Sequence, residues 1–172
     1  MATELKNLSD YNSASIPNAA EMKFAIVVAD WNSDITYALR DGAKKTLLDN
    51  GAKKENITIN YVPGSFELPL GAQYAAEYTD ADAILCIGCV IQGETKHFDF
   101  ICQSVAQGLM LLGGRFNKPF VFGVLTTNNL QQAKDRAGGK HGNKGDEAAI
   151  TAIKMIALKK SFKPKKGGIG FL

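Results

Sequence analysis

Residue types that stabilise small secreted domains, or that anchor a chain in a bilayer, are scarce in this sequence. The 172 residues include three cysteines, and this odd number does not suit a disulfide framework. The longest apolar run, Ala83 to Ile91, is far shorter than the roughly 20 residues that span a bilayer. The N-terminal residues contain no apolar stretch typical of a signal peptide. We therefore expect a cytoplasmic protein with no membrane segment and no disulfides.

Metal-binding and redox motifs are also missing. His97 and His141 lie on different predicted elements, and no cluster of His, Cys, Asp and Glu has the spacing of metal ligands. We expect no metal. Cys86 and Cys89 form a C-x-x-C pair, but redox pairs of this kind usually open a helix, whereas these two lie in a predicted strand. We expect buried thiols.

The net charge of +3 comes from the C-terminal end of the chain. Five lysines there carry more than the net excess of positive charge: Lys159, Lys160, Lys163, Lys165 and Lys166. A short lysine-rich end, with no aromatic platforms between its charges, is typical of a solvated terminus. We expect no nucleic-acid partner.

The pattern of apolar residues predicts a single α/β domain. Residues 1–21 are polar and aperiodic, which predicts a flexible arm; 22–160 form the domain, and 161–172 form a basic tail. Strands are predicted at 24–29, 57–62, 83–91 and 119–125, and helices at 35–47, 68–78, 98–112, 131–136 and 147–160. This alternation indicates right-handed crossovers, hence a three-layer α/β/α sandwich with a four-stranded parallel sheet.

Ligands bind such sheets at the carboxyl ends of the strands, so the residues that follow each strand are the candidates. Trp31, the only tryptophan, follows the first strand beside Asn32. It suits stacking on a flat heterocycle, or it is a packing anchor. Ser65, Phe66 and Glu67 follow the second strand. They suit a ligand contact, or Ser65 caps the next helix while Glu67 complements its dipole.

The third and fourth strands are followed by residues that suit an anion. Glu94, Thr95 and His97 combine the free N–H groups of a helix start with an imidazole for acid–base work. Alternatively, Thr95 caps the helix and His97 lies on its surface. Arg136, one of three arginines, suits a phosphate, or it is a charge at a helix C-terminus. Gly139-Lys140 is not followed by Ser or Thr, which excludes a nucleotide P-loop.

Five motifs, in order and spacing, resemble the lumazine synthase family: VADWN, VPGSFELP, GCVIQGETKHFDF, FGVLTT and DRAGGKHGNKGDEAA. The resemblance covers roughly residues 22 to 160. It implies a flavodoxin-like fold and the condensation of 5-amino-6-(D-ribitylamino)uracil with 3,4-dihydroxy-2-butanone 4-phosphate. The products are 6,7-dimethyl-8-ribityllumazine, phosphate and water. This is the penultimate step of riboflavin biosynthesis, and it needs no cofactor.

The resemblance also implies a role for each motif residue. Trp31 stacks on the pyrimidine, where the family commonly has phenylalanine, and His97 is the general acid–base residue. The substrate ring and ribityl chain are held by Ser65, Phe66, Glu67, Cys89, Val90 and Ile91. The phosphate is bound by Glu94, Thr95 and Arg136, the first two through backbone N–H groups. A neighbouring subunit supplies Phe122, and Asn32 and Lys144 assist.

The resemblance further implies partners and an assembly. The partners are the two small-molecule substrates and riboflavin synthase, and the protein is a homo-oligomer with sites at subunit interfaces. Family members form pentamers, paired pentamers or icosahedral shells, and the sequence does not distinguish these. Two other functions compete: a riboflavin synthase of the archaeal type, and a non-catalytic flavin carrier or shell protein. GETKHF followed by RAGGKHGNKG argues against the first, and His97 together with Arg136 argues against the second.

Overall fold

The computed structural model describes residues 7–162. Residues 1–6 of the expected arm and 163–172 of the expected basic tail lie outside this range. No helix among the described residues is long and apolar enough to cross a membrane.

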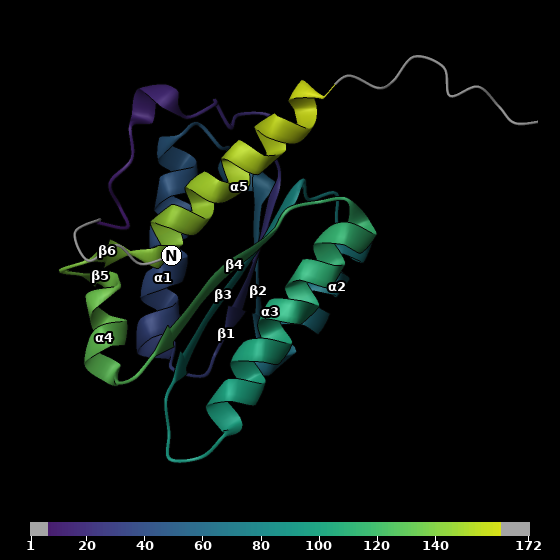
Figure 1. Ribbon diagram of the computed structural model, residues 1–172. Helices are drawn as coiled ribbons and strands as arrows, with labels where there is room; N and C mark the ends of the chain where they lie inside the picture. The colour runs from purple at the N-terminus through teal and green to yellow at the C-terminus, as the bar shows by residue number, and fades with distance from the viewer. Residues whose placement is uncertain (1–6, 163–172) are drawn as a thin grey trace, which may run out of the picture.

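Four parallel strands form the central sheet, in the order β2-β1-β3-β4 (Figure 1). Their bounds are β1 Phe24–Ala29, β2 Ile57–Val62, β3 Ala83–Ile91 and β4 Phe120–Thr127. All six residues of β1 and the first seven of β3 are buried, because helices cover both faces of the sheet. Fully burying one large aliphatic side chain contributes about 1.5–3 kcal/mol. The two central strands are therefore a large contributor to stability, together with the helix side chains that pack on them.

Helices lie on both faces of the sheet and complete the predicted three-layer sandwich (Figure 1). On one face are α1 (Ser33–Asp49) and α5 (Lys144–Ser161), and on the other are α2 (Leu68–Tyr78) and α3 (His97–Phe116). The short helix α4 (Leu130–Asp135) follows β4. The fold class predicted from the sequence is confirmed.

The structure differs from the sequence prediction mainly after β3. Helix α3 continues through Gly113-Gly114 and ends where Asn117 adopts a left-handed conformation with φ 48°. Glycine weakens a helix without ending it when the helix is packed, and α3 buries Leu109 and Leu112 against the sheet. The loop expected after Arg136 contains a two-stranded antiparallel hairpin, β5 (Ala137–Gly139) and β6 (Gly142–Asn143).

Helix α5 begins three residues earlier than predicted, and the reason is a cap. The side-chain oxygen of Asn143 accepts a hydrogen bond of 2.8 Å from the N–H of Gly145. This bond satisfies one of the donors that every helix start leaves free. The helix consequently starts at Lys144 and packs closely on α1 at Gly145.

Part of the segment before β1 packs on the domain. Ala19 is fully buried, and its N–H donates to the Asn50 carbonyl at 2.9 Å. A 3-10 turn, Ser13–Ser15, and the residues around it lie over the end of α1 and the β5–β6 hairpin (Figure 1). The buried core therefore includes residues that precede position 22.

Candidate active site

The topology opens a crevice between the carboxyl ends of β1 and β3. From β1 the chain crosses to β2 on one side, whereas from β3 it crosses to β4 on the other, so the connections diverge between these two neighbours. Divergence of this kind leaves room for a ligand beyond the strand ends. A cavity of about 680 Å³ lies there. It is lined by Trp31, Asn32, Gly64, Ser65, Phe66, Glu67, Cys89, Val90, Ile91, His97 and Ile101.

Nine of the fourteen residues given a role in the sequence analysis line this one cavity. They come from four separate segments of the chain that only the parallel sheet brings together. Ile101 also lines the cavity and is not among the predicted site residues. Its position four residues after His97, on the same side of α3, is the signal that could have placed it at the site.

Trp31 is exposed at the mouth of the cavity. Its side chain is 71% accessible, while its backbone N–H donates to the Pro63 carbonyl at 3.1 Å. A tryptophan that served as a packing anchor would be largely buried, so the structure argues against that alternative. A fixed backbone and a free indole face leave a flat apolar surface available to a ligand.

Asn32 joins the ends of β1 and β3. It adopts a left-handed conformation with φ 62°, which asparagine tolerates better than most residues, and its Nδ2 donates to the Cys89 carbonyl at 3.0 Å. The ladder between β1 and β3 ends at Val28 and Ile87, whereas β3 continues to pair with β4 through Ile91. Beyond Ile87, the β1-facing edge of β3 is therefore open to the cavity except where Asn32 contacts it.

Ser65 is a buried hydroxyl without a partner. Its side chain is 7% exposed, and Oγ has no hydrogen-bond partner among the described residues. Gly88 on β3 makes room for it, because a Cβ there would lie 2.8 Å from this Oγ. Ser65 opens a 3-10 turn, Ser65–Glu67, and does not cap α2, which begins at Leu68. The capping alternative is wrong, and an unsatisfied buried hydroxyl on a cavity wall suits a ligand contact.

Burial makes the two strand cysteines unreactive. Cys86 and Cys89 are both buried in β3, and desolvation raises the pKa of the Cys89 thiol to about 11. Because the thiolate is the reactive form, both remain protonated near neutral pH. Neither thiol is therefore suited to react with a ligand, and the expectation of buried thiols is confirmed for this pair.

The loop before α3 places His97 at the cavity and leaves Glu94 and Thr95 beside it. All three residues are exposed, and only His97 lines the cavity. Thr95 Oγ1 accepts a long hydrogen bond, 3.4 Å, from the N–H of His97. Thr95 contacts the start of the helix, but the N-cap is Lys96 and no side chain caps the helix, so the structure does not confirm Thr95 as the cap. His97 faces the cavity. The first N–H groups of this 20-residue helix point toward the same loop.

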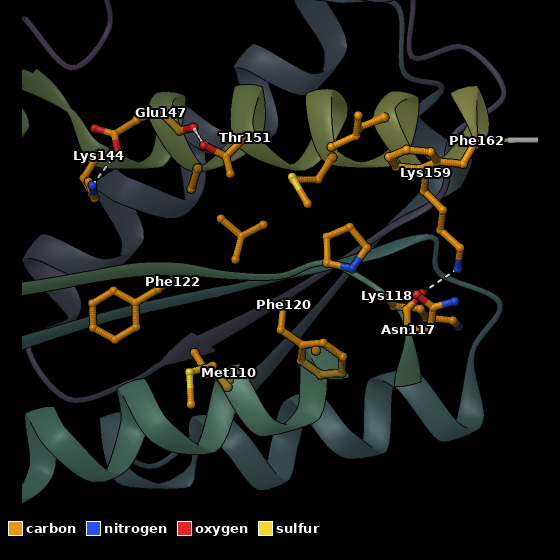
Figure 2. A pocket seen from close by; sticks show the side chains of 17 residues that line it. Met110, Asn117, Lys118, Phe120, Phe122, Lys144, Glu147, Thr151, Lys159 and Phe162 are labelled. Carbon is orange, nitrogen blue, oxygen red and sulfur yellow. Dashed lines mark hydrogen bonds and ion pairs between the residues drawn. The ribbon is translucent and has the colours of Figure 1, made fainter. Parts of the chain in front are cut away.

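Phe122, Lys144 and Arg136 lie away from this cavity. Phe122 and Lys144 line a second cavity of about 620 Å³ between α3, β4 and α5, as Figure 2 shows. Arg136 lines neither cavity; it ends α4, and its Nη1 donates to the Gln132 carbonyl at 3.0 Å. Within one chain, the structure does not bring these three residues to the first cavity.

The second cavity is an apolar groove along the edge strand of the sheet. β4 is the edge of the sheet, and Figure 2 shows Phe120 and Phe122 beneath α5 with Met110 on α3. Three large apolar side chains of α3 and α5 that line this groove are exposed: Met110 at 70%, Met155 at 44% and Leu158 at 48%. An open strand edge beside an apolar patch is typical of a protein interface.

Comparison with known proteins identifies the family of the chain. The family model for 6,7-dimethyl-8-ribityllumazine synthase matches residues 21–160. The chain belongs to this family. It is similar to the 6,7-dimethyl-8-ribityllumazine synthase of Cytophaga hutchinsonii, with 59% identity over 157 residues that cover 91% of this chain and 98% of the relative.

Two further lumazine synthases show the same extent of similarity. That of Parabacteroides distasonis is 53% identical over 156 residues, which cover 91% of this chain and 98% of its own. That of Christiangramia forsetii is 52% identical over 168 residues, which cover 97% of this chain and all of its own. As a lumazine synthase, the enzyme condenses the ribitylaminouracil with the butanone phosphate in the penultimate step of riboflavin biosynthesis.

Proposed function

We propose that the cavity between β1 and β3 binds the ribitylaminouracil substrate of this lumazine synthase. The observation that carries the proposal is the convergence of an exposed indole, an open strand edge and an unpartnered hydroxyl on one cavity. Trp31 stacks on the pyrimidine, and the β3 backbone from Cys89 to Ile91 forms hydrogen bonds with the polar edge of the ring. Ser65 and Glu67, together with Phe66, contact the ring and the ribityl chain.

The phosphate of the second substrate binds at the start of α3. The N-terminus of a long helix offers free N–H groups and the positive end of the dipole, and the proposal assigns Glu94 and Thr95 to it through their backbone. The exposed Glu94 carboxylate has room to face solvent. Arg136 supplies the positive charge that the anion needs.

A neighbouring copy of the chain completes the site. Phe122 and Arg136 lie outside the first cavity of their own chain, and Phe122 borders an apolar groove along the open edge of β4. The proposal therefore places the edge of one copy against the cavity of the next, which brings these two residues and Lys144 to it. The protein then acts as a homo-oligomer, and one chain alone forms only half of each site.

His97 moves protons during the condensation. The 5-amino group of the uracil attacks the ketone and loses water to form a Schiff base, and phosphate is then eliminated. The ribitylamino nitrogen attacks the remaining carbonyl, and loss of a second water closes the ring and gives the lumazine. Each step transfers protons, and an imidazole beside the cavity is suited to this work near neutral pH. The domain at 22–160 carries all of these groups, and riboflavin synthase, which consumes the lumazine, is the proposed pathway partner.

Ser65→Ala tests the assignment of the cavity. A buried hydroxyl without a partner costs about 1–3 kcal/mol, so alanine should leave the free energy of unfolding unchanged or slightly higher. The same change should raise KM for the ribitylaminouracil about tenfold, because one substrate hydrogen bond is lost. Urea unfolding and steady-state kinetics, followed by lumazine absorbance, measure both effects.

Ser104→Ala, at an exposed position of α3 that does not line the cavity, is the control and should change neither quantity. An unchanged KM for the uracil in Ser65→Ala, with normal folding, would contradict the cavity assignment. A loss of stability would show instead that the hydroxyl has a partner within the protein.

A further inference from the structure

The segment Asn7–Ser9 contacts the β5–β6 hairpin, more than 130 residues later in the chain. The Leu8 N–H donates to the His141 carbonyl at 2.8 Å, and the Asn143 N–H donates to Ser9 Oγ at 2.9 Å. One bond lies at the hairpin tip and the other at its returning strand. The segment is thus fixed to the hairpin by both backbone and side chain.

The packing between this segment and the hairpin is close. Gly142 adopts φ +78°, and a Cβ there would lie 2.0 Å from Asn7 Oδ1 and 2.7 Å from the Ser9 nitrogen. Gly142 is buried, although it lies in a hairpin on the outside of the domain. Only a glycine at this position allows the segment to lie against the hairpin.

A short chain of hydrogen bonds joins Ser9 to two proposed site residues. Asn143, whose N–H is held by Ser9, directly precedes Lys144 in sequence, and the Lys144 N–H donates to the Arg136 carbonyl at 2.9 Å. Asn143 also caps α5 and donates from Nδ2 to the Ala38 carbonyl at 3.0 Å. The hydrogen bond between Arg136 and Lys144 at the base of the hairpin therefore fixes the backbone of both residues. Ser9 stabilises this base through its bond to the neighbouring Asn143.

We propose that Ser9 is a positioning residue for Arg136 and Lys144, and that the Asn7–Ser9 segment holds the hairpin in the conformation that presents Arg136 to phosphate. The inference rests on the proposed phosphate role of Arg136. Without the Ser9 hydroxyl, the Asn143 N–H loses its hydrogen-bond partner, and β6 is held less firmly. The side chains of Arg136 and Lys144 would then sample more positions. Binding of the phosphate group should weaken, while the uracil cavity, which contains no residue of the hairpin, should be unaffected.

Ser9→Ala and Ser9→Thr, with Arg136→Ala as the reference, test this inference on the full chain. Ser9→Ala should raise KM for 3,4-dihydroxy-2-butanone 4-phosphate, and the inhibition constant of inorganic phosphate, by about threefold to tenfold. KM for the ribitylaminouracil should stay the same. Ser9→Thr keeps the hydroxyl and should restore the native values. Ser15→Ala is the matched control, because Ser15 Oγ donates only within its own turn, to the Asn12 carbonyl.

The outcomes separate this inference from the proposed function. If Arg136→Ala weakens phosphate binding and Ser9→Ala does not, the positioning role is overturned while the role of Arg136 stands. Equal changes in both KM values for Ser9→Ala would also overturn it, since they would indicate a general structural effect. If Arg136→Ala leaves phosphate binding unchanged, the phosphate assignment fails and the inference fails with it.

Discussion

His97→Ala is expected to lower kcat about 100-fold to 10,000-fold, the usual contribution of a positioned acid–base group. His97 is exposed at the start of α3, and its side chain makes no hydrogen bond among the described residues, so the thermal unfolding temperature should not change. Measurable activity should remain, because holding two substrates together contributes more to the rate than one proton transfer. Single-turnover absorbance of the lumazine product measures the chemical step directly.

His141→Ala is the matched control for this prediction. His141 is the other histidine of the chain, lies in the β5–β6 turn and does not line the cavity of its own chain, so its removal should lower kcat far less than removal of His97 does. A native kcat in His97→Ala would contradict the acid–base role. Complete loss of activity with a normal fold would contradict the claim that holding the two substrates together contributes more to the rate than proton transfer by His97.

Gly145→Ala is expected to destabilise the protein by about 3 kcal/mol or more, at or above the upper end of ordinary overpacking in a core. A Cβ at this position would lie 1.9 Å from the Leu39 carbonyl oxygen and 2.9 Å from the Ala43 nitrogen. Both neighbours are backbone atoms of α1, which cannot move aside as a flexible side chain could. The two helices would have to separate, and the buried apolar residues between them would lose contact.

Gly114→Ala provides the control for the effect of replacing a helical glycine. It lies within α3 with no atom near its ideal Cβ, so alanine should stabilise the helix by about 0.5–1 kcal/mol. Urea unfolding of both variants measures the difference. A Gly145→Ala protein as stable as the native one would contradict the close crossing of α1 and α5.

Much of the fold could be predicted from the sequence because the core strands are continuous apolar runs. The three strands before α3 have the predicted bounds, since their residues are fixed by burial or by alternation. The β5–β6 hairpin could not be predicted in this way. Its strands are two and three residues long, and the contacts of Leu8 and Ser9 that help to hold it are polar, long-range and without a period.

The site was predictable to the extent that parallel topology places strand ends together. Trp31, Ser65 and His97 follow three different strands, and the sheet order brings all three to one cavity. The place of Arg136 could not be predicted, because spacing along a chain does not say whether a residue faces its own cavity or that of another copy. Its assignment to the phosphate stays a prediction.

Co-assembly of two defective variants tests the shared site most directly. His97→Ala and Arg136→Ala chains are unfolded together, refolded as mixed oligomers and assayed for lumazine formation. If His97 of one copy and Arg136 of its neighbour serve the same site, about a quarter of the sites in an equal mixture contain both native residues. Activity should then rise to about that fraction of the native rate, well above the mean of the two variants.

A mixture of His97→Ala and Ser65→Ala is the control, because both residues line the cavity of one chain and therefore belong to the same half of each site. Mixing these two variants should give an activity no higher than the mean of their separate activities. No site in the mixture combines a native His97 with a native Ser65. Restored activity only in the first mixture is the predicted result. A first mixture no more active than the mean of its components would contradict a site shared between copies.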